Sequence, residues 1–160
     1  EESVGCSPDK DYTKNKKTDV TDNDFEAAFK TFLSWNPLLT QPYVVDASQM
    51  LLDKLNTDSR ITLGTTISAP GFYGPQGRVI RLQLADPEIN TKISAFRYNG
   101  RKVTNYEMEW SAIYGLSTML GHNAATVCAI IANRKAGNSN ADYKPSVVAL
   151  VEHVLNALSK

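Results

Sequence analysis

The sequence predicts an α/β fold with a mixed central sheet flanked by helices. Segments rich in β-branched residues alternate with segments whose apolar residues recur at helical spacing, an order typical of α/β domains. One extended segment, TVCAIIA at residues 126–132, is apolar throughout. Such a segment is expected of a strand that is covered on both faces of a largely parallel sheet.

The size and charge of the chain limit the classes of partner. Its 160 residues are 42% hydrophobic, which is enough for one ordinary core. Lys plus Arg and Asp plus Glu number 17 each, so no net charge attracts nucleic acid or an anionic membrane surface. No apolar run approaches the roughly 18 residues of a membrane span, and Cys128 has the apolar surroundings of a buried free thiol. We therefore expect a cytoplasmic protein that binds neither nucleic acid nor membrane.

The chain is expected to divide near its amino-terminal end. Residues 1–23 carry almost no apolar side chains to bury, so they are expected to form a polar loop or tail. Residues 24–160 are expected to form the folded part. Its first element is a helix from Phe25 to Leu33, where apolar residues recur at helical spacing until Asn36. The chain begins with Glu rather than Met, and we expect that an amino-terminal part is missing.

The remaining elements follow from β-branched runs and from helical periodicity with its end signals. A β-branched pair lies at Val44 and Val45, and strands are expected at 61–69, 102–106 and 126–132. Helices are expected at 50–55 with Asp46 or Ser48 as cap, at 107–120 before Gly121, and at 144–158 with Pro145 near its start.

Two glutamates stand at the beginning of the helix expected at 107–120. Thr104 and Glu107 have the spacing of a capping box, and the helix dipole favours an anion at Glu109, so a structural role explains both. In the functional alternative, a carboxylate here accepts hydrogen bonds from two adjacent ribose hydroxyls and stabilises positive charge on the sugar ring. Met108 would then pack on the sugar. The residues alone leave both interpretations open.

A Gly- and Pro-rich segment, GFYGPQGR at residues 71–78, follows the strand expected at 61–69. Such clusters are usually turns, and this one lacks the Lys-Ser/Thr ending of a P-loop. An extended segment would, however, project Gln76 and Arg78 from one face. Their donors and acceptor match a uracil edge better than a purine edge. Phe72 would add aromatic surface for the base.

Three segments, ISAPGFYGPQGR, FRYNGRKVTNYEMEWSAIYGLSTMLGH and TVCAIIANR, resemble in order and spacing the carboxyl-terminal part of uridine phosphorylases in the nucleoside phosphorylase family. The resemblance runs from Phe25 to Lys160 and implies part of that fold. It also implies reversible phosphorolysis, in which phosphate attacks the anomeric carbon of uridine and uracil leaves through an oxocarbenium-like state. Phosphate is then the co-substrate, and neither a cofactor nor a metal is expected.

The resemblance also implies roles for particular residues. The implied substrate-binding residues are Phe72, Gln76, Arg78, Glu107, Met108 and Glu109. Gln76 and Arg78 would bind uracil, Phe72 would line the pocket, and Met108 with Glu109 would hold the ribose, with Glu107 assisting at the 2′-hydroxyl.

Glu109 and Arg134 are the residues that the resemblance implies for catalysis. Arg134, in the segment ANR, resembles the family arginine near the base O4, and its alternative is a surface cation. His122 and His153 match no catalytic position and are expected to be surface or packing residues.

Two departures from the family pattern affect the expected function. Trp110 stands where relatives usually carry a small residue, and the chain lacks the Gly-rich loop and arginines that bind phosphate in the family's amino-terminal half. We therefore expect a homo-oligomer or a companion amino-terminal half. One alternative is a non-catalytic homologue that binds nucleoside or pairs with a full-length relative. Another is a purine nucleoside phosphorylase or nucleosidase of the same fold, against which Gln76 and Arg78 argue.

Overall fold

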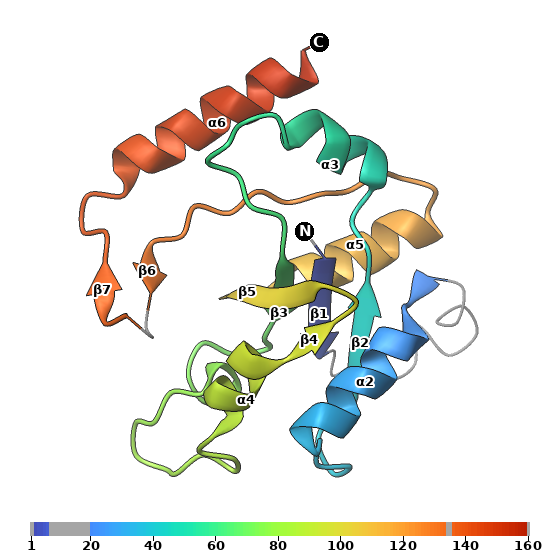
Figure 1. Ribbon diagram of the computed structural model, residues 1–160, viewed down its shortest axis with the longest axis vertical. Coiled ribbons are helices and arrows are strands. Elements are labelled where there is room, and N and C mark those ends of the chain that lie inside the picture. The colour runs from blue at the N-terminus through green and yellow to red at the C-terminus, as the bar shows by residue number, and fades with distance from the viewer. Residues whose placement is uncertain (1, 7–19, 134–135, 160) are drawn as a thin grey trace.

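The computed structural model describes residues 2–6 by their backbone and residues 20–133 and 136–159 with their side chains (Figure 1). In chain order its elements are β1 (Glu2–Cys6), α2 (Asn23–Leu33), β2 (Pro42–Val45), α3 (Gln49–Leu55), β3 (Thr65–Ser68), the 3-10 helix η1 (Gly74–Gln76), α4 (Ile89–Ala95), β4 (Arg97–Tyr98), β5 (Arg101–Glu107), α5 (Trp110–Met119), β6 (Ala132–Asn133), β7 (Asn138–Ser139) and α6 (Lys144–Leu158).

A mixed sheet with the strand order β2-β1-β3-β5-β4 forms the centre of the molecule. The strands β1, β3 and β5 are parallel, whereas β2 and β4 are antiparallel to their neighbours. Ser68 of β3 lies opposite Glu107 of β5, so these two strands end at the same edge of the sheet. The predicted mixed sheet is confirmed, and the segments that follow β3 and β5 begin side by side.

Helices cover both faces of the sheet, and each face has its own core. The neighbouring residues Val44 and Val45 of β2 point to opposite faces, as successive residues of a strand do. Val44 packs with α2 and α4, where Phe25 meets Phe96 edge-on with ring centroids 5.3 Å apart. Val45 packs with Tyr114 of α5, which lies behind the sheet in Figure 1.

Two of the expected helices have nearly the expected bounds. The helix α2 begins after Asp22, whose carboxylate accepts a hydrogen bond from the Phe25 amide at 2.9 Å. It ends at Leu33, because Ser34 adopts a left-handed φ of 51°. The helix α6 occupies Lys144–Leu158, as predicted. None of the described helices is both long enough and apolar enough to cross a membrane.

The structure corrects two predictions of extended structure. Residues 2–6 were expected within a polar loop, but they form the strand β1, which pairs with β2 on one side and β3 on the other. Backbone hydrogen bonds on both sides need no apolar side chains, so composition does not reveal such a strand. The domain boundary at residue 23 stays a prediction. The apolar segment 126–132 was expected to be a strand, yet only Ala132 belongs to one, and no described strand pairs with residues 126–131.

Other bounds differ by a few residues. The strand expected at 61–69 is confined to Thr65–Ser68, and the helix expected from Glu107 begins at Trp110, because β5 continues through Glu107. The helix α3 starts after Ser48, whose side chain forms no capping bond and instead donates to the side chain of Asn123 at 2.9 Å.

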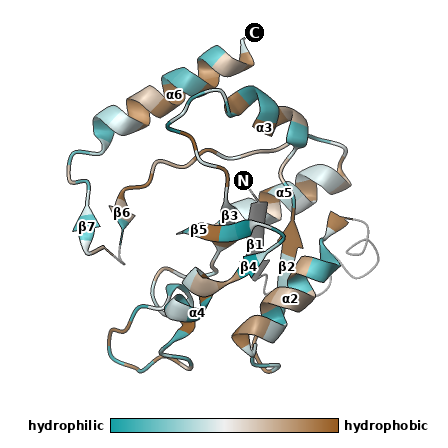
Figure 2. Cartoon of the chain, viewed as in Figure 1, coloured by the Kyte–Doolittle hydropathy of each residue, from teal (hydrophilic) through white to brown (hydrophobic). Residues whose placement is uncertain are grey.

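The helix α6 carries apolar side chains on two sides. Ala149 and Leu150 line a cavity against the rest of the molecule. Val147, Val151, Leu155 and Leu158, which we call the α6 stripe, are spaced four, four and three residues apart and are exposed. Figure 2 shows the hydrophobic bands along this helix. A helix that is apolar on opposite sides is usually covered on both.

Candidate functional site

The segment that follows β3 folds back on itself around η1. The backbone amides of Gln76 and Arg78 both donate to the carbonyl oxygen of Tyr73 at 3.0 Å. Gly77 lies between them with a φ of 71°, a conformation that glycine adopts at low cost. The prediction that Gln76 and Arg78 project from one face of an extended segment is therefore wrong, because the segment is a tight turn.

The structure brings Arg78 and Phe72 together. The guanidinium carbon of Arg78 lies 3.4 Å from the centroid of the Phe72 ring, a cation–π contact. Phe72 is 50% exposed, so the free part of its ring is accessible. Arg78 also lines a largely apolar cavity of about 660 Å³. Gln76 is only 3% exposed and is packed inside the turn.

Asn90 of α4 attaches this turn to the sheet. Its side-chain amide donates to the carbonyl oxygens of Gln76 at 3.3 Å and of Gly77 at 3.4 Å, and its side-chain oxygen accepts a hydrogen bond from the Tyr106 hydroxyl at 2.7 Å. Tyr106 belongs to β5. The sequence did not predict a role for Asn90 or Tyr106, because nothing in the local sequence links them to a turn more than ten residues away.

Glu107, the last residue of β5, caps the helix α5. One oxygen of its carboxylate, Oε2, accepts hydrogen bonds from the backbone amides of Glu109 at 2.6 Å and Trp110 at 2.9 Å. The capping box expected with Thr104 is absent, because Thr104 lies within β5 and its hydroxyl donates to the carbonyl oxygen of Thr65 at 3.3 Å. A structural role for Glu107 is therefore present, with different partners.

Ser68 and Ser111 complete the hydrogen bonds around Glu107. The Ser68 hydroxyl donates to the other carboxylate oxygen, Oε1, and accepts a hydrogen bond from the Ser111 amide at 2.8 Å. Both serines are 4% exposed. We call these bonds, with those to the Glu109 and Trp110 amides, the Glu107 network. Sequence reasoning missed both serines, since an isolated serine carries no signal of a partner far along the chain.

Met108 and Glu109 lie on the exposed side of the turn between β5 and α5. Met108 is 41% exposed, and among the described residues the Glu109 side chain has no hydrogen-bond partner. Neither residue lines the cavity beside Arg78. Trp110 turns toward the core and packs near Tyr114, with ring centroids 6.3 Å apart. Arg134 lies outside the described residues.

The two sets of predicted residues therefore lie at the ends of adjacent strands. The Ala69 amide donates to the carbonyl oxygen of Glu107 at 2.8 Å, so the pairing of β3 and β5 extends to the point where both strands end. Residues 71–78 leave from β3, and residues 108–109 leave from β5. The carboxyl ends of neighbouring parallel strands are where α/β folds bind ligands.

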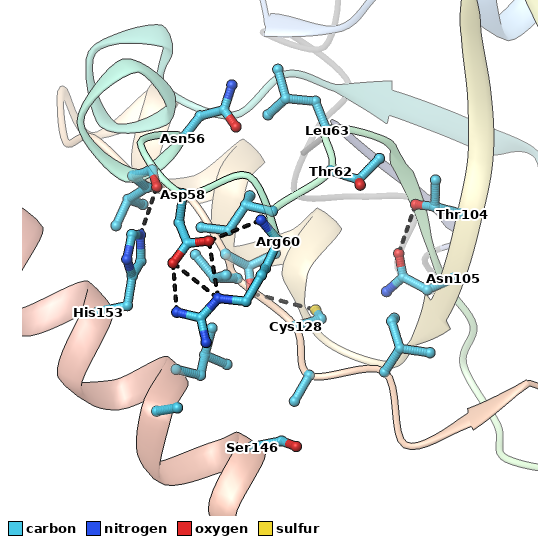
Figure 3. A pocket seen from close by; sticks show the side chains of 18 of the residues that line it. Asn56, Asp58, Arg60, Thr62, Leu63, Thr104, Asn105, Cys128, Ser146 and His153 are labelled. Carbon is cyan, nitrogen blue, oxygen red and sulfur yellow. Dashed lines mark hydrogen bonds and ion pairs between the residues drawn. The ribbon is translucent and has the colours of Figure 1, made fainter. Parts of the chain in front are cut away.

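A second cavity, of about 450 Å³, lies between α3, α6 and residues 126–131, and none of the predicted site residues that the structure describes lines it (Figure 3). Asp58 faces Arg60 there, and hydrogen bonds from the Arg60 side chain and backbone hold the pKa of the Asp58 carboxyl well below its usual range. His153 Nε2 lies 2.7 Å from the carbonyl oxygen of Leu55, a packing contact between α6 and α3. Cys128 lines the same cavity as a half-buried free cysteine.

In the described part of the chain no cluster of three or more His, Cys, Asp or Glu residues could hold a metal ion.

Comparisons with known proteins agree on one fold. No protein-family model matches the sequence. A stretch of 94 residues, 51% of this chain, is 35% identical to uridine phosphorylase of Thermococcus kodakarensis and spans 31% of that protein. A solved structure of a Trypanosoma brucei nucleoside phosphorylase, described as showing uridine phosphorylase activity, matches 99% of this chain with a TM-score of 0.74 and 24% identity. This chain covers 56% of that structure's chain, so it spans only part of both relatives. The resemblance to uridine phosphorylases is confirmed, and the chain has part of the nucleoside phosphorylase fold.

Proposed function

We propose that the chain is the nucleoside-binding portion of a uridine phosphorylase, a pentosyltransferase that converts uridine and phosphate to uracil and ribose 1-phosphate. The observation that carries the proposal is the parallel pairing of β3 with β5, which starts the 71–78 turn and residues 108–109 from one edge of the sheet. The identity with the Thermococcus uridine phosphorylase supports the choice of substrate. The proposal places the protein in cytoplasmic nucleoside salvage.

The base-binding part of the proposal uses the turn after β3. The guanidinium of Arg78 binds the uracil edge, and the half-exposed ring of Phe72 lines the base and sugar. The resemblance adds the amide of Gln76 to the uracil edge, although this side chain is only 3% exposed here. A base that left these polar groups unpaired would bind less tightly, which gives selectivity. Arg134 is placed near the base O4 by the resemblance alone.

The sugar-binding part uses the turn after β5. Met108 and Glu109 are exposed there, and the Glu109 carboxylate accepts hydrogen bonds from the ribose hydroxyls. Its charge also stabilises the positive charge that develops on the sugar ring as uracil leaves. Glu107 belongs to the same turn, where hydrogen bonds from the protein engage both of its carboxylate oxygens.

Phosphorolysis also requires a phosphate site, and we propose that a companion amino-terminal half supplies it. The chain covers 56% of the Trypanosoma nucleoside phosphorylase chain, so the remainder of that chain has no counterpart here. The α6 stripe is an exposed apolar surface against which the companion half packs. Phosphate is the co-substrate, and the proposal includes no cofactor.

The test is to incubate the purified chain with uridine and phosphate and to follow uracil release, with and without the amino-terminal half of the Thermococcus enzyme. Uridine and inosine binding are measured in parallel by calorimetry. Uracil release only in the mixture would support the proposal. Uridine binding without release in either sample would favour the non-catalytic homologue, and equal binding of uridine and inosine would contradict the assignment of Gln76 and Arg78.

A further inference from the structure

We propose that Ser68 is a positioning residue for the ribose-binding turn and that it acts through Glu107 on Glu109. This inference rests on the proposed function, because it takes Glu109 as the residue that binds ribose. It changes the part assigned to Glu107, from a ribose ligand to the link between Ser68 and Glu109. The basis is the Glu107 network, which joins the ends of β3 and β5 to the beginning of α5.

The Ser68 hydroxyl is fully used inside the protein. It has one proton to donate, which goes to Glu107 Oε1, and it accepts a hydrogen bond from the Ser111 amide at 2.8 Å. Ser68 is 4% exposed, so water does not readily replace these bonds. Because Ser68 lies opposite Glu107 in the β3–β5 pairing, the sheet itself holds the hydroxyl beside the carboxylate.

Glu107 passes this constraint to the next residues. Its Oε1 is held by Ser68, and its Oε2 accepts hydrogen bonds from the amides of Glu109 at 2.6 Å and Trp110 at 2.9 Å. A carboxylate offers about four acceptor positions, and three of them are occupied by the protein. Little capacity remains for a ribose hydroxyl, so the chief effect of Glu107 is on the backbone path through Met108 and Glu109.

The position of the Glu109 carboxylate depends on this backbone path. Its side chain is exposed and has no hydrogen-bond partner among the described residues, so nothing else in that part of the chain orients it. Binding groups that are held in place before the ligand arrives bind more tightly, because less entropy is lost. Removal of the Ser68 hydroxyl would leave Glu107 Oε1 without its bond to β3 and would loosen the turn that carries Glu109, while Gln76 and Arg78 would keep their separate anchor at Asn90.

The test compares uridine with uracil, which lacks the ribose. Ser68→Ala is expected to weaken uridine binding by about tenfold, the effect of losing a hydrogen bond to a charged group. Uracil binding is expected to change by less than about twofold, because Asn90 anchors the base-binding turn by hydrogen bonds that do not involve Ser68. Calorimetry on the chain, complemented as above, gives both affinities. An equal loss for both ligands, or no loss for uridine, would overturn the proposal.

Thr66→Val is the matched control. Thr66 lies two residues earlier on the same strand, is buried, and donates a hydrogen bond to the Asn105 side chain at 2.8 Å. Loss of this hydrogen bond disturbs β3 but leaves the hydrogen bonds of Glu107 in place. The ratio of uridine to uracil affinity should therefore equal that of the unmodified chain. A shift in that ratio equal to the Ser68→Ala shift would show a general effect of the strand and would contradict the proposal.

Amide hydrogen exchange tests the positioning without any ligand. In Ser68→Ala the amides of Glu109 and Trp110 should exchange faster by about tenfold, and in Thr66→Val they should not. Unchanged exchange in Ser68→Ala would refute the positioning role even if the proposed function holds. If the unmodified, complemented chain binds neither uridine nor uracil, the proposed function fails and the ribose role of Ser68 fails with it, whatever the exchange shows.

Discussion

Gln76 and Arg78 occupy different environments although one residue separates them. Gly77 reverses the chain between them with its positive φ, so Gln76 is buried in the turn while Arg78 rests on the Phe72 ring. The side chain of Asn90 holds the backbone at Gln76 and Gly77. The base-binding groups are therefore positioned by contacts outside the GFYGPQGR segment as well as within it.

The first prediction concerns base recognition at Gln76. Gln76→Ala should weaken uracil binding by about 1 to 3 kcal/mol, because polar groups of the buried base edge lose their partner. Gln49→Ala is a suitable control, since Gln49 is an exposed glutamine of α3 that lines neither cavity. Calorimetric titration with uracil measures both. Equal affinities for Gln76→Ala and the control would contradict the assignment.

The second prediction separates catalysis at Glu109 from the electrostatic effect of its charge on the helix dipole. Glu109→Gln should lower the turnover of the complemented enzyme far more than it lowers stability, since the loss of a first-turn charge costs only about 0.3 to 1 kcal/mol. Glu88→Gln is the matched control, because Glu88 precedes α4 as Glu109 precedes α5. The side chain of Glu88, like that of Glu109, forms no capping bond. Uracil release and denaturant unfolding are measured for both variants. Normal turnover in Glu109→Gln with reduced stability would leave only the helix-dipole role.

At the scale of elements, the beginning of α5 shows how a helix can be capped from a strand. Glu107 ends β5 and still accepts hydrogen bonds from the amides of Glu109, which precedes α5, and of Trp110, its first residue. The spacing of Thr104 and Glu107 fits a capping box only if both residues belong to the helix start, and Thr104 instead lies within β5, where the pairing with β3 shifts register. Strand pairing with β3 outweighs the local capping pattern.

The third prediction concerns the turn that η1 forms after β3. Gly77→Ala should destabilise the protein by about 1 to 2 kcal/mol, because a residue with a Cβ is strained at the φ of 71°. The added methyl would also overlap the side chain of Asn90. Gly74→Ala is the control, since a Cβ at Gly74 meets nothing within 4 Å. Denaturant unfolding gives both values, and equal destabilisation would show that Gly77 has no special role.

At the scale of the whole molecule, the two cores stabilise the sheet and its covering helices, whereas α6 stands apart from both. No described residue of α6 is buried, although one of its sides lines the cavity of Figure 3 and the other carries the α6 stripe. Residues 126–131 are apolar and lie outside any strand pairing among the described residues. We propose that the companion amino-terminal half covers this end of the molecule.

The fourth prediction follows from the exposure of the α6 stripe. A Val151→Asp, Leu155→Asp double variant should change the unfolding free energy of the isolated chain by less than about 0.5 kcal/mol, because both side chains are already exposed. It should nevertheless abolish association with the companion amino-terminal half. Asn156→Asp adds a charge outside the stripe and should leave association intact.

Native mass measurement and uracil release by the mixture give the outcome of this fourth prediction. Association that survives the double variant would place the companion elsewhere. Loss of a homodimer instead of a mixed complex would identify a second copy as the occupant of the stripe.

The sequence by itself determined the elements and residues whose signals are local. Helical spacing with its end signals located α2 and α6, the β-branched residues located the core of β3, and the motifs carried the resemblance that the comparisons confirmed. Each of these signals lies within a short segment of the sequence, where neighbouring side chains interact directly.

Only the tertiary structure decided the features that depend on distant partners. The strand β1 exists through backbone bonds to β2 and β3, and residues 126–131 stay outside the sheet, since no described strand pairs with them. Ser68 meets Glu107 across 39 positions and Ser111 across 43. The physical reason is that a strand ladder or a buried hydrogen bond needs both partners in place, and no local pattern says which distant residue the fold will bring there.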